Sequence, residues 1–245
     1  MTYCVGLNLE DGLVMLGDTR TNAGVDNVST FSKLYTAAEA GERVLCLLAA
    51  GNLGITQAVW NKLGEGVVLD GATHTLLTVP SMFRAAQLVG GAVRAVDAAD
   101  GPALRARGIA FAASFLLGGQ IGTGSVQLYL VYSAGNFIEA TADTPYLQIG
   151  EHKYGKPTLL RVLGHSTGLE DGAKLALLSM DDTLGANLSV GMPLDMLVYR
   201  RDSLLLPPVR RIEERDPYFQ ALRDGWTNRI RGVFRELTPP DWLPR

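Results

Sequence analysis

The first twenty residues, MTYCVGLNLEDGLVMLGDTR (residues 1–20), predict two strands joined by a tight turn. Apolar side chains alternate with small or polar ones over residues 2–10, which is typical of a half-buried strand. Asp11-Gly12 is a two-residue hairpin signal, and residues 13–16 form a continuous apolar run that suits a strand covered on both faces. The chain therefore begins with a β-hairpin whose second strand ends at Asp18.

The remaining patterns predict an α+β fold with two sheets. Period-two or continuous apolar runs indicate strands over 31–37, 43–50, 109–117, 126–132, 137–140, 146–149 and 190–199. Helical spacing indicates helices over about 53–63 and 81–93, and a capping box at Thr167-Gly168-Leu169-Glu170 starts another that reaches about residue 184. Two mostly antiparallel sheets, packed together and flanked by helix layers, would cover every apolar face.

The composition favours one compact domain over residues 1–245 and excludes several functional classes. Of the 245 residues, 47% are apolar and 19% charged, and no Lys/Arg block suits nucleic acid. No apolar stretch approaches the length of a membrane span. Cys4 and Cys46 lie in apolar runs, and His74, His152 and His165 lack ligand spacing. We therefore expect a cytoplasmic protein with no metal and no cofactor.

The C-terminal part, residues 212–245, is predicted to be a helical extension. Asp216-Pro217 supplies a cap and a first-turn residue, and a long apolar stripe follows. This apolar stripe is larger than a solvent-exposed helix at a chain end requires. We therefore expect it to dock on the body or on a neighbouring subunit. The stripe consists of Tyr218, Leu222, Trp226, Ile230, Val233 and Leu237.

Thr2 is the first candidate for a reactive group. Removal of Met1 would leave a free α-amine, whose ordinary pKa of about 7.7–8.0 lets it act as a general base near neutral pH. A Thr hydroxyl beside its own amine is a known activated nucleophile. The alternative is an ordinary second residue, which is the commoner case.

Asp18 and Lys33 form the second candidate group. A lysine in the predicted strand over residues 31–37 is costly unless paired, and Asp18 is a suitable partner if the two strands are neighbours. Beside Thr2, the Lys33 ammonium would keep the α-amine neutral, because like charges disfavour each other. An ion pair that only fixes the fold is the alternative, and these two residues alone do not separate the readings.

The backbone N–H of Gly51 could stabilise an oxyanion. The turn Ala49-Ala50-Gly51-Asn52 ends an apolar strand just before a helix, where free amides can stabilise developing negative charge. A plain strand-to-helix turn is the alternative. Asp181-Asp182 is a further possible carboxylate pair, although a solvated helix end explains it equally well.

Thr2, Gly17-Asp18, Lys33 and Ala50-Gly51 before a helix together resemble the proteasome β-subunit type of N-terminal nucleophile hydrolase. More narrowly, residues 1–34, LAAGNLGITQ (48–57) and SMDDTLGANLSVGMPLDMLVY (179–199) look like the bacterial proteasome-like family called Anbu. The resemblance covers the whole chain. It implies a four-layer αββα sandwich and assembly into homo-oligomers. No sequence feature indicates whether an ATP-driven unfoldase binds these oligomers.

The family pattern assigns Thr2 as nucleophile, its amine as base, Lys33 as the cation that tunes the amine, Asp18 as its orienting carboxylate and Gly51 as an oxyanion amide. Two family signatures are imperfect here. A Gly-Ser-Gly turn is replaced by Ile149-Gly150-Glu151, and of the later Asp-x-x-Ser-Gly signature only Asp182 and Ser189 have counterparts. These last two are candidate supporting residues.

The sequence thus predicts a threonine-type peptidase that forms an acyl ester on Thr2 once Met1 is removed. Two alternatives stay open. One is a non-catalytic, self-assembling scaffold subunit, and the other is an amidase for a specialised small peptide.

Overall fold

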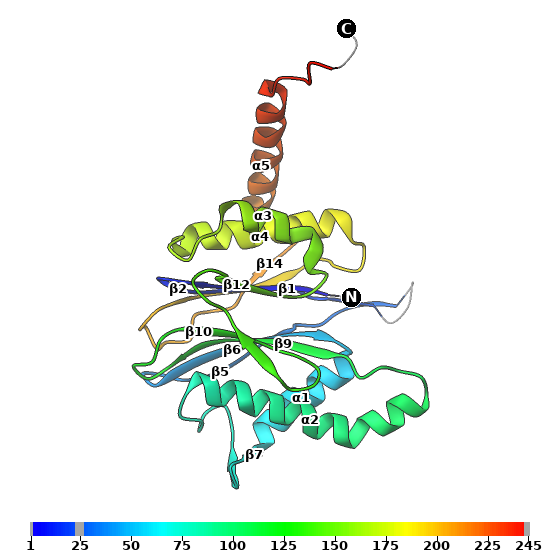
Figure 1. Cartoon of the computed structure of the whole chain (residues 1–245), viewed down its shortest axis with the longest axis vertical. Coiled ribbons are helices and arrows are strands. Elements are labelled where there is room, and N and C mark those ends of the chain that lie inside the picture. Colours follow the sequence, from blue (N-terminus) through cyan, green and yellow to red (C-terminus); the bar gives the residue numbers. More distant parts are fainter. Residues whose placement is uncertain (1, 23–26, 243–245) are drawn as a thin grey trace.

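The structure, a computed structural model, describes residues 2–22 and 27–242. Met1, whose removal the proposed chemistry requires, lies outside the described residues. Two five-stranded sheets lie face to face, and a layer of helices covers the outer face of each (Figure 1). The predicted α+β, four-layer αββα arrangement is confirmed.

The first sheet contains the N-terminal hairpin. β1 (Tyr3–Leu9) and β2 (Gly12–Asp18) pair in the register that the Asp11-Gly12 turn imposes, with Leu9 opposite Gly12 and Cys4 opposite Gly17. All neighbouring strands of this sheet are antiparallel. Its order is β12 (Tyr146–Gly150), β1, β2, β13 (Leu194–Arg200), β14 (Arg210–Ile212).

The second sheet is also antiparallel throughout. Its order is β11 (Phe137–Glu139), β10 (Gln127–Val131), β9 (Ala113–Ile121), β6 (Arg43–Gly51), β5 (Leu34–Glu39). Two short ribbons lie outside the sheets: β3 (Arg20–Asn22) with β4 (Val28–Thr30), and β7 (Val67–Leu69) with β8 (Ala72–His74).

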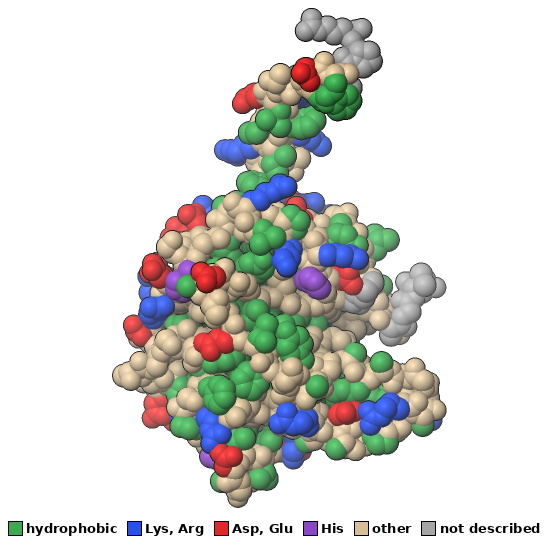
Figure 2. Space-filling model, in the orientation of Figure 1, with side chains coloured by type: hydrophobic (Ala, Val, Ile, Leu, Met, Phe, Trp, Pro, Cys, Tyr) green, Lys and Arg blue, Asp and Glu red, His purple; other side chains and the backbone are tan. Residues whose placement is uncertain are grey.

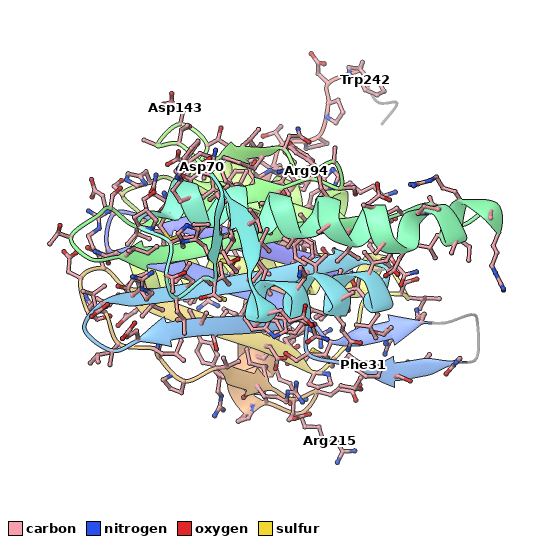
Figure 3. The ribbon with its side chains drawn as sticks, turned by 90° about the horizontal axis from the view of Figure 1, so that it is seen from below. Phe31, Asp70, Arg94, Asp143, Arg215 and Trp242 are labelled. Atoms are coloured by element: carbon pink, nitrogen blue, oxygen red, sulfur yellow. The ribbon has the colours of Figure 1, made fainter. Side chains whose placement is uncertain are left out.

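Helices α1 (Leu53–Glu65) and α2 (Met82–Ala106) lie side by side across the outer face of the second sheet (Figures 1 and 3). Helices α3 (His152–Val162) and α4 (Leu169–Ala186) cover the first sheet in the same way. Among the described helices, none is long and apolar enough to cross a membrane.

Three apolar cores hold the four layers together, one at each interface between layers. Side chains of β1 alternate between two of them. Tyr3, Val5 and Leu7 face α3 and α4, whereas Cys4 faces the second sheet. The strand predicted to be half buried is therefore covered on both faces, because its small residues leave room for the second sheet to approach.

Several elements differ from the sequence prediction. β9 begins four residues later than predicted and continues through Gly118-Gly119, and the sequence patterns give no range for α3. Thr167 does not cap α4: Gly168 holds the N-cap position, and the Thr167 hydroxyl instead accepts a hydrogen bond from the Gly164 amide at 3.0 Å. Short-range side-chain bonds of this kind compete with capping.

The C-terminal helix α5 (Pro217–Glu236) projects from the α3–α4 layer (Figure 1). Ile212, where the sequence places the start of the extension, is a buried residue of β14 and belongs to the body. Phe219 is the one buried residue of α5. The projecting part therefore begins with the helix itself.

Both thiols are buried between the two sheets, and burial raises the pKa of Cys4 and of Cys46 far above the ordinary thiol value. Burial therefore disfavours the thiolate form of both residues in the folded state. We expect no reaction with a water-soluble thiol reagent in the native protein and reaction of both cysteines after unfolding in guanidinium. Rapid labelling of either native thiol would contradict this packing.

Candidate active site

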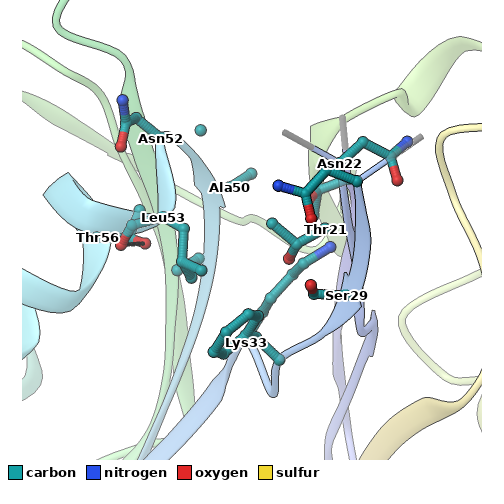
Figure 4. Close-up of a pocket in the computed structure, with 13 residues that line it drawn as sticks. Thr21, Asn22, Ser29, Lys33, Ala50, Asn52, Leu53 and Thr56 are labelled. Atoms are coloured by element: carbon teal, nitrogen blue, oxygen red, sulfur yellow. Dashed lines mark hydrogen bonds between the residues drawn. The ribbon is translucent and has the colours of Figure 1, made fainter. Parts of the chain in front are cut away.

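A cavity of about 470 Å³ opens where the two sheets, the β3–β4 ribbon and the start of α1 meet. Figure 4 shows its two walls, with Thr21, Ser29 and Lys33 on one side and Asn52, Leu53 and Thr56 on the other. The described residues that line it are Thr2, Thr21, Asn22, Asn27, Ser29, Phe31, Lys33, Ala49, Ala50, Gly51, Asn52, Leu53 and Thr56.

Thr2 lines this cavity and is only 7% exposed. The start of β1 pairs with the end of β12, and the Glu151 amide donates to the Thr2 carbonyl at 2.8 Å. Gly150 passes so close that a Cβ atom there would lie 1.8 Å from the Thr2 carbonyl oxygen, and its φ is +79°. A glycine is needed at this position, and it fixes the backbone of Thr2.

Asp18 is fully buried and holds three N–H groups that come from distant parts of the chain. Its Oδ1 accepts from the Lys33 ammonium at 2.7 Å and from the Tyr3 amide at 3.2 Å, while Oδ2 accepts from the Gly191 amide at 3.2 Å. Burial raises the pKa of the Asp18 carboxyl, and Lys33 and the two amides oppose that shift. The carboxylate thus ties the residue after Thr2 to Lys33.

Lys33 is 5% exposed and lies just before β5, at the edge of the second sheet. The sequence predicts a pair between neighbouring strands, but β2 and β5 belong to different sheets, so the pair links the two sheets. The ammonium donates to Asp18 and, at 2.6 Å, to the Arg20 carbonyl. An ammonium has three donors, so the third remains for a group in the cavity.

Gly51 ends β6 with a φ of +122°, and a Cβ atom there would lie 2.2 Å from the Ala112 carbonyl oxygen. Amide directions alternate along a strand. The Asn52 amide donates to Ala112 on the β9 side, and the Ala49 amide donates to Lys33 on the β5 side. The Gly51 N–H therefore points to the β5 side, beyond the first residue of β5, where the cavity lies.

The two candidate supporting residues lie elsewhere. Asp182 faces a second cavity between α3, α4 and α5, where the Thr158 hydroxyl donates to it. Ser189 follows α4, and its amide donates to the Asn187 side chain at 2.9 Å. Neither residue lines the cavity that contains Thr2. This region contacts the site through the Gly191 amide, two residues after Ser189, which donates a hydrogen bond to Asp18.

One wall of the cavity consists of residues that no sequence pattern singles out. Thr21, Asn22 and Ser29 come from the β3–β4 ribbon, and Phe31 follows it (Figures 3 and 4). Strands of three residues are too short for a periodic signal. The run of four polar residues directly after Asp18 (residues 19–22) is a clue, since polar side chains that follow buried strands are often found at binding sites.

The buried pair yields a prediction for stability. Replacing Lys33 by Met leaves the Asp18 carboxylate buried without its cation, and we expect a loss of about 3–5 kcal/mol in the free energy of unfolding, measured by urea titration. The double variant Asp18→Asn with Lys33→Met should lose less, because no charge is then buried.

The matched control is Lys62→Met, which breaks the exposed pair between Lys62 and Glu65 and should cost less than about 1 kcal/mol. If Lys33→Met were as mild as this control, the buried pair would not be a major constraint on the fold.

Searches against protein-family models and against curated proteins return no match. Solved structures match closely. The helical assembly of the Anbu complex from Pseudomonas aeruginosa has 48% sequence identity and a TM-score of 0.92, with 99% of this chain and 100% of that chain covered. Anbu (ancestral beta-subunit) from Yersinia bercovieri has 44% identity and a TM-score of 0.90, with 98% and 100% covered.

An Anbu Gly-1 mutant from Hyphomicrobium sp. strain MC1 has 46% identity and a TM-score of 0.90 over 98% of this chain and 100% of that chain. All three likenesses extend over nearly the full length of both chains. Identity at this level, with the same fold throughout, establishes common descent. The chain therefore belongs to the Anbu family of proteasome β-subunit-like proteins.

Proposed function

We propose that this protein is a threonine-type N-terminal nucleophile hydrolase that cleaves amide bonds in peptides. One observation carries the proposal: Thr2, Lys33 and Gly51, which are far apart in the sequence, line one cavity. The roles below apply to the protein after Met1 is removed, when residue 2 carries a free α-amine.

The reaction begins when the Thr2 hydroxyl gives its proton to the α-amine and Oγ1 attacks the substrate carbonyl carbon. The resulting oxyanion accepts a hydrogen bond from the Gly51 N–H. The carbon–nitrogen bond then breaks, and the leaving amine takes the proton from the α-ammonium. Water, deprotonated by the same amine, hydrolyses the ester and restores Thr2.

Lys33 and Asp18 set the charge at this site. A positive charge on Lys33 disfavours a second positive charge nearby, so the α-amine of Thr2 would be kept neutral and able to accept a proton. Asp18 holds the Lys33 ammonium in place at 2.7 Å. Because Asp18 also accepts from the Tyr3 amide, it couples the position of Lys33 to that of the first residues of β1.

The apolar face of α5 supports self-assembly as a second part of the function. Phe234 is 73% exposed, and Figure 2 shows hydrophobic side chains along the projecting helix. We propose that this face packs against a second copy of the chain. The Pseudomonas aeruginosa relative is described as a helical assembly, which favours the same behaviour here. A non-catalytic scaffold, which the sequence leaves open, would share this property.

The test of the hydrolase is covalent labelling. A peptide epoxyketone or β-lactone should add one equivalent to the wild-type protein, as measured by intact mass spectrometry with peptide mapping to Thr2. Thr2→Val keeps the shape of the side chain but lacks the hydroxyl and should give no adduct, whereas Thr2→Ser should still react.

N-terminal sequencing must first show that the labelled protein begins at Thr2. Absence of any Thr2-dependent adduct on such protein refutes the hydrolase, and stable retention of Met1 in cells would favour the scaffold.

The test of assembly is sedimentation velocity. Truncation before Asp216 should reduce the mass of the assembled species, because it removes the exposed apolar face of α5. Val233→Glu places a charge on that face and should have the same effect. Asn228→Glu, on an exposed polar position of the helix, is the matched control. Unchanged assembly in the truncated and Val233→Glu proteins would refute the interface.

A further inference from the structure

Tyr3, the residue directly after the proposed nucleophile, is fully buried and is used in no step of the proposed reaction. Side chains alternate along β1, so Thr2 lines the active-site cavity while Tyr3 packs under α3 and α4, which cover the outer face of this sheet (Figure 1). A buried phenol hydroxyl needs a polar partner. The partners of the Tyr3 hydroxyl come from the segment that holds Thr2.

The Tyr3 hydroxyl belongs to a directed chain of hydrogen bonds. Ser179 Oγ donates to the Gly155 carbonyl at 2.9 Å, which uses its single proton. The Tyr3 hydroxyl, 2.6 Å from Ser179 Oγ, is therefore the donor of that pair, and its own oxygen accepts from the Gln148 side-chain amide. Burial raises the pKa of the Tyr3 phenol, so the hydroxyl keeps the proton that it donates.

The two ends of this chain enclose the residue that binds the Thr2 carbonyl. Gln148 lies in β12, and Gly155 lies in the first turn of α3. Between them, the Glu151 amide donates to the Thr2 carbonyl at 2.8 Å. The approach of α3 is close, since a Cβ atom at Gly155 would lie 2.9 Å from the Tyr3 hydroxyl oxygen. The segment over residues 148–155 is therefore attached to Tyr3 on both sides of its contact with Thr2.

Tyr3 is also tied to the charged pair. Its backbone amide donates to Asp18 Oδ1 at 3.2 Å, and the same oxygen accepts from the Lys33 ammonium at 2.7 Å. Once Met1 is removed, residue 2 is the end of the chain and is held by a covalent neighbour on one side only. Chain ends are poorly ordered unless other contacts tie them down. The contacts of Tyr3 and of the Thr2 carbonyl supply that restraint here.

We propose that Tyr3 is a positioning residue for Thr2. Its hydroxyl anchors the segment that binds the Thr2 carbonyl, while its amide fixes the same end of β1 to Asp18, so the nucleophile keeps its place relative to Lys33. Reactivity depends on such placement, because a displacement of about 1 Å can lower a rate about a hundredfold. The effect on the reaction rests on the proposed function, whereas the anchoring of the Thr2 backbone does not.

The first test measures how fast Thr2 reacts. Tyr3→Phe keeps the ring and removes the hydroxyl. We expect kinact for a peptide β-lactone to fall about tenfold while KI stays within about twofold, because the cavity wall is unchanged. Ser179→Ala removes the acceptor of the Tyr3 hydroxyl and should also lower kinact. It decides the question if thermal melting shows that Tyr3→Phe does not fold.

Tyr199→Phe is the matched control. Tyr199 is also buried, and its hydroxyl donates to Gln120 Oε1 at 2.7 Å, but it lies opposite Leu13, at the other end of β2 from Asp18. Loss of this hydroxyl should lower the melting temperature and leave kinact unchanged. A merely structural role of Tyr3 would give both variants this same behaviour.

The second test does not depend on activity. Hydrogen–deuterium exchange, resolved to single residues by fragmentation mass spectrometry, follows the Glu151 amide that donates to Thr2. In Tyr3→Phe this amide should exchange about threefold to tenfold faster than in the wild type, the change that loss of one neutral hydrogen bond supplies. In Tyr199→Phe its exchange should stay the same.

Unchanged kinact in both Tyr3→Phe and Ser179→Ala would overturn the inference, as would an equal fall in Tyr199→Phe. So would unchanged exchange of the Glu151 amide, since the hydroxyl would then not hold the Thr2 backbone. If wild-type protein that begins at Thr2 forms no adduct, the hydrolase is refuted. Faster exchange in Tyr3→Phe would then retain the anchor and exclude only its role in the reaction.

Discussion

The buried pair between Asp18 and Lys33 is the constraint on which the site depends. Asp18 ends a strand of one sheet and Lys33 precedes a strand of the other, so the ion pair fixes how the two sheets meet at this end of the sandwich. Two buried charges are tolerated because backbone donors and acceptors complete their coordination, with amides from Tyr3 and Gly191 on the carboxylate and the Arg20 carbonyl on the ammonium. The same contacts determine where Thr2 lies.

The sequence could predict the sheets because most of their strands carry apolar patterns, and it could predict the pair because a lysine within a predicted strand is conspicuous. It could not predict that β9 runs through Gly118-Gly119, since a glycine pair ordinarily marks a turn. The structure gives the reason: Gly118 lies against the Leu13 side chain, and a Cβ atom there would be 2.5 Å from it. Contacts between sheets of this kind have no local signature.

The wall of the cavity that the β3–β4 ribbon forms could not be predicted from sequence patterns, for a different reason. The β3–β4 ribbon is held by three residue pairs and contributes polar side chains without apolar periodicity. Its position depends on tertiary contacts: the Phe31 amide donates to the Thr19 carbonyl, and the Arg20 carbonyl accepts from Lys33. The residues expected to carry catalysis were therefore easier to name than those that would bind the substrate.

A pair whose only role was to join the sheets would need no open cavity beside it. Lys33 instead lines an open cavity together with Thr2 and Gly51. The Gly51 N–H on the β5 side has no neighbouring strand, because β5 begins only at Leu34, opposite Leu48. Gly51 and Gly150 both adopt backbone conformations that favour glycine, and each allows a close backbone approach next to this cavity. Constraints of this kind collected around one opening favour a site for chemistry over a scaffold, because a scaffold gains nothing from keeping the opening.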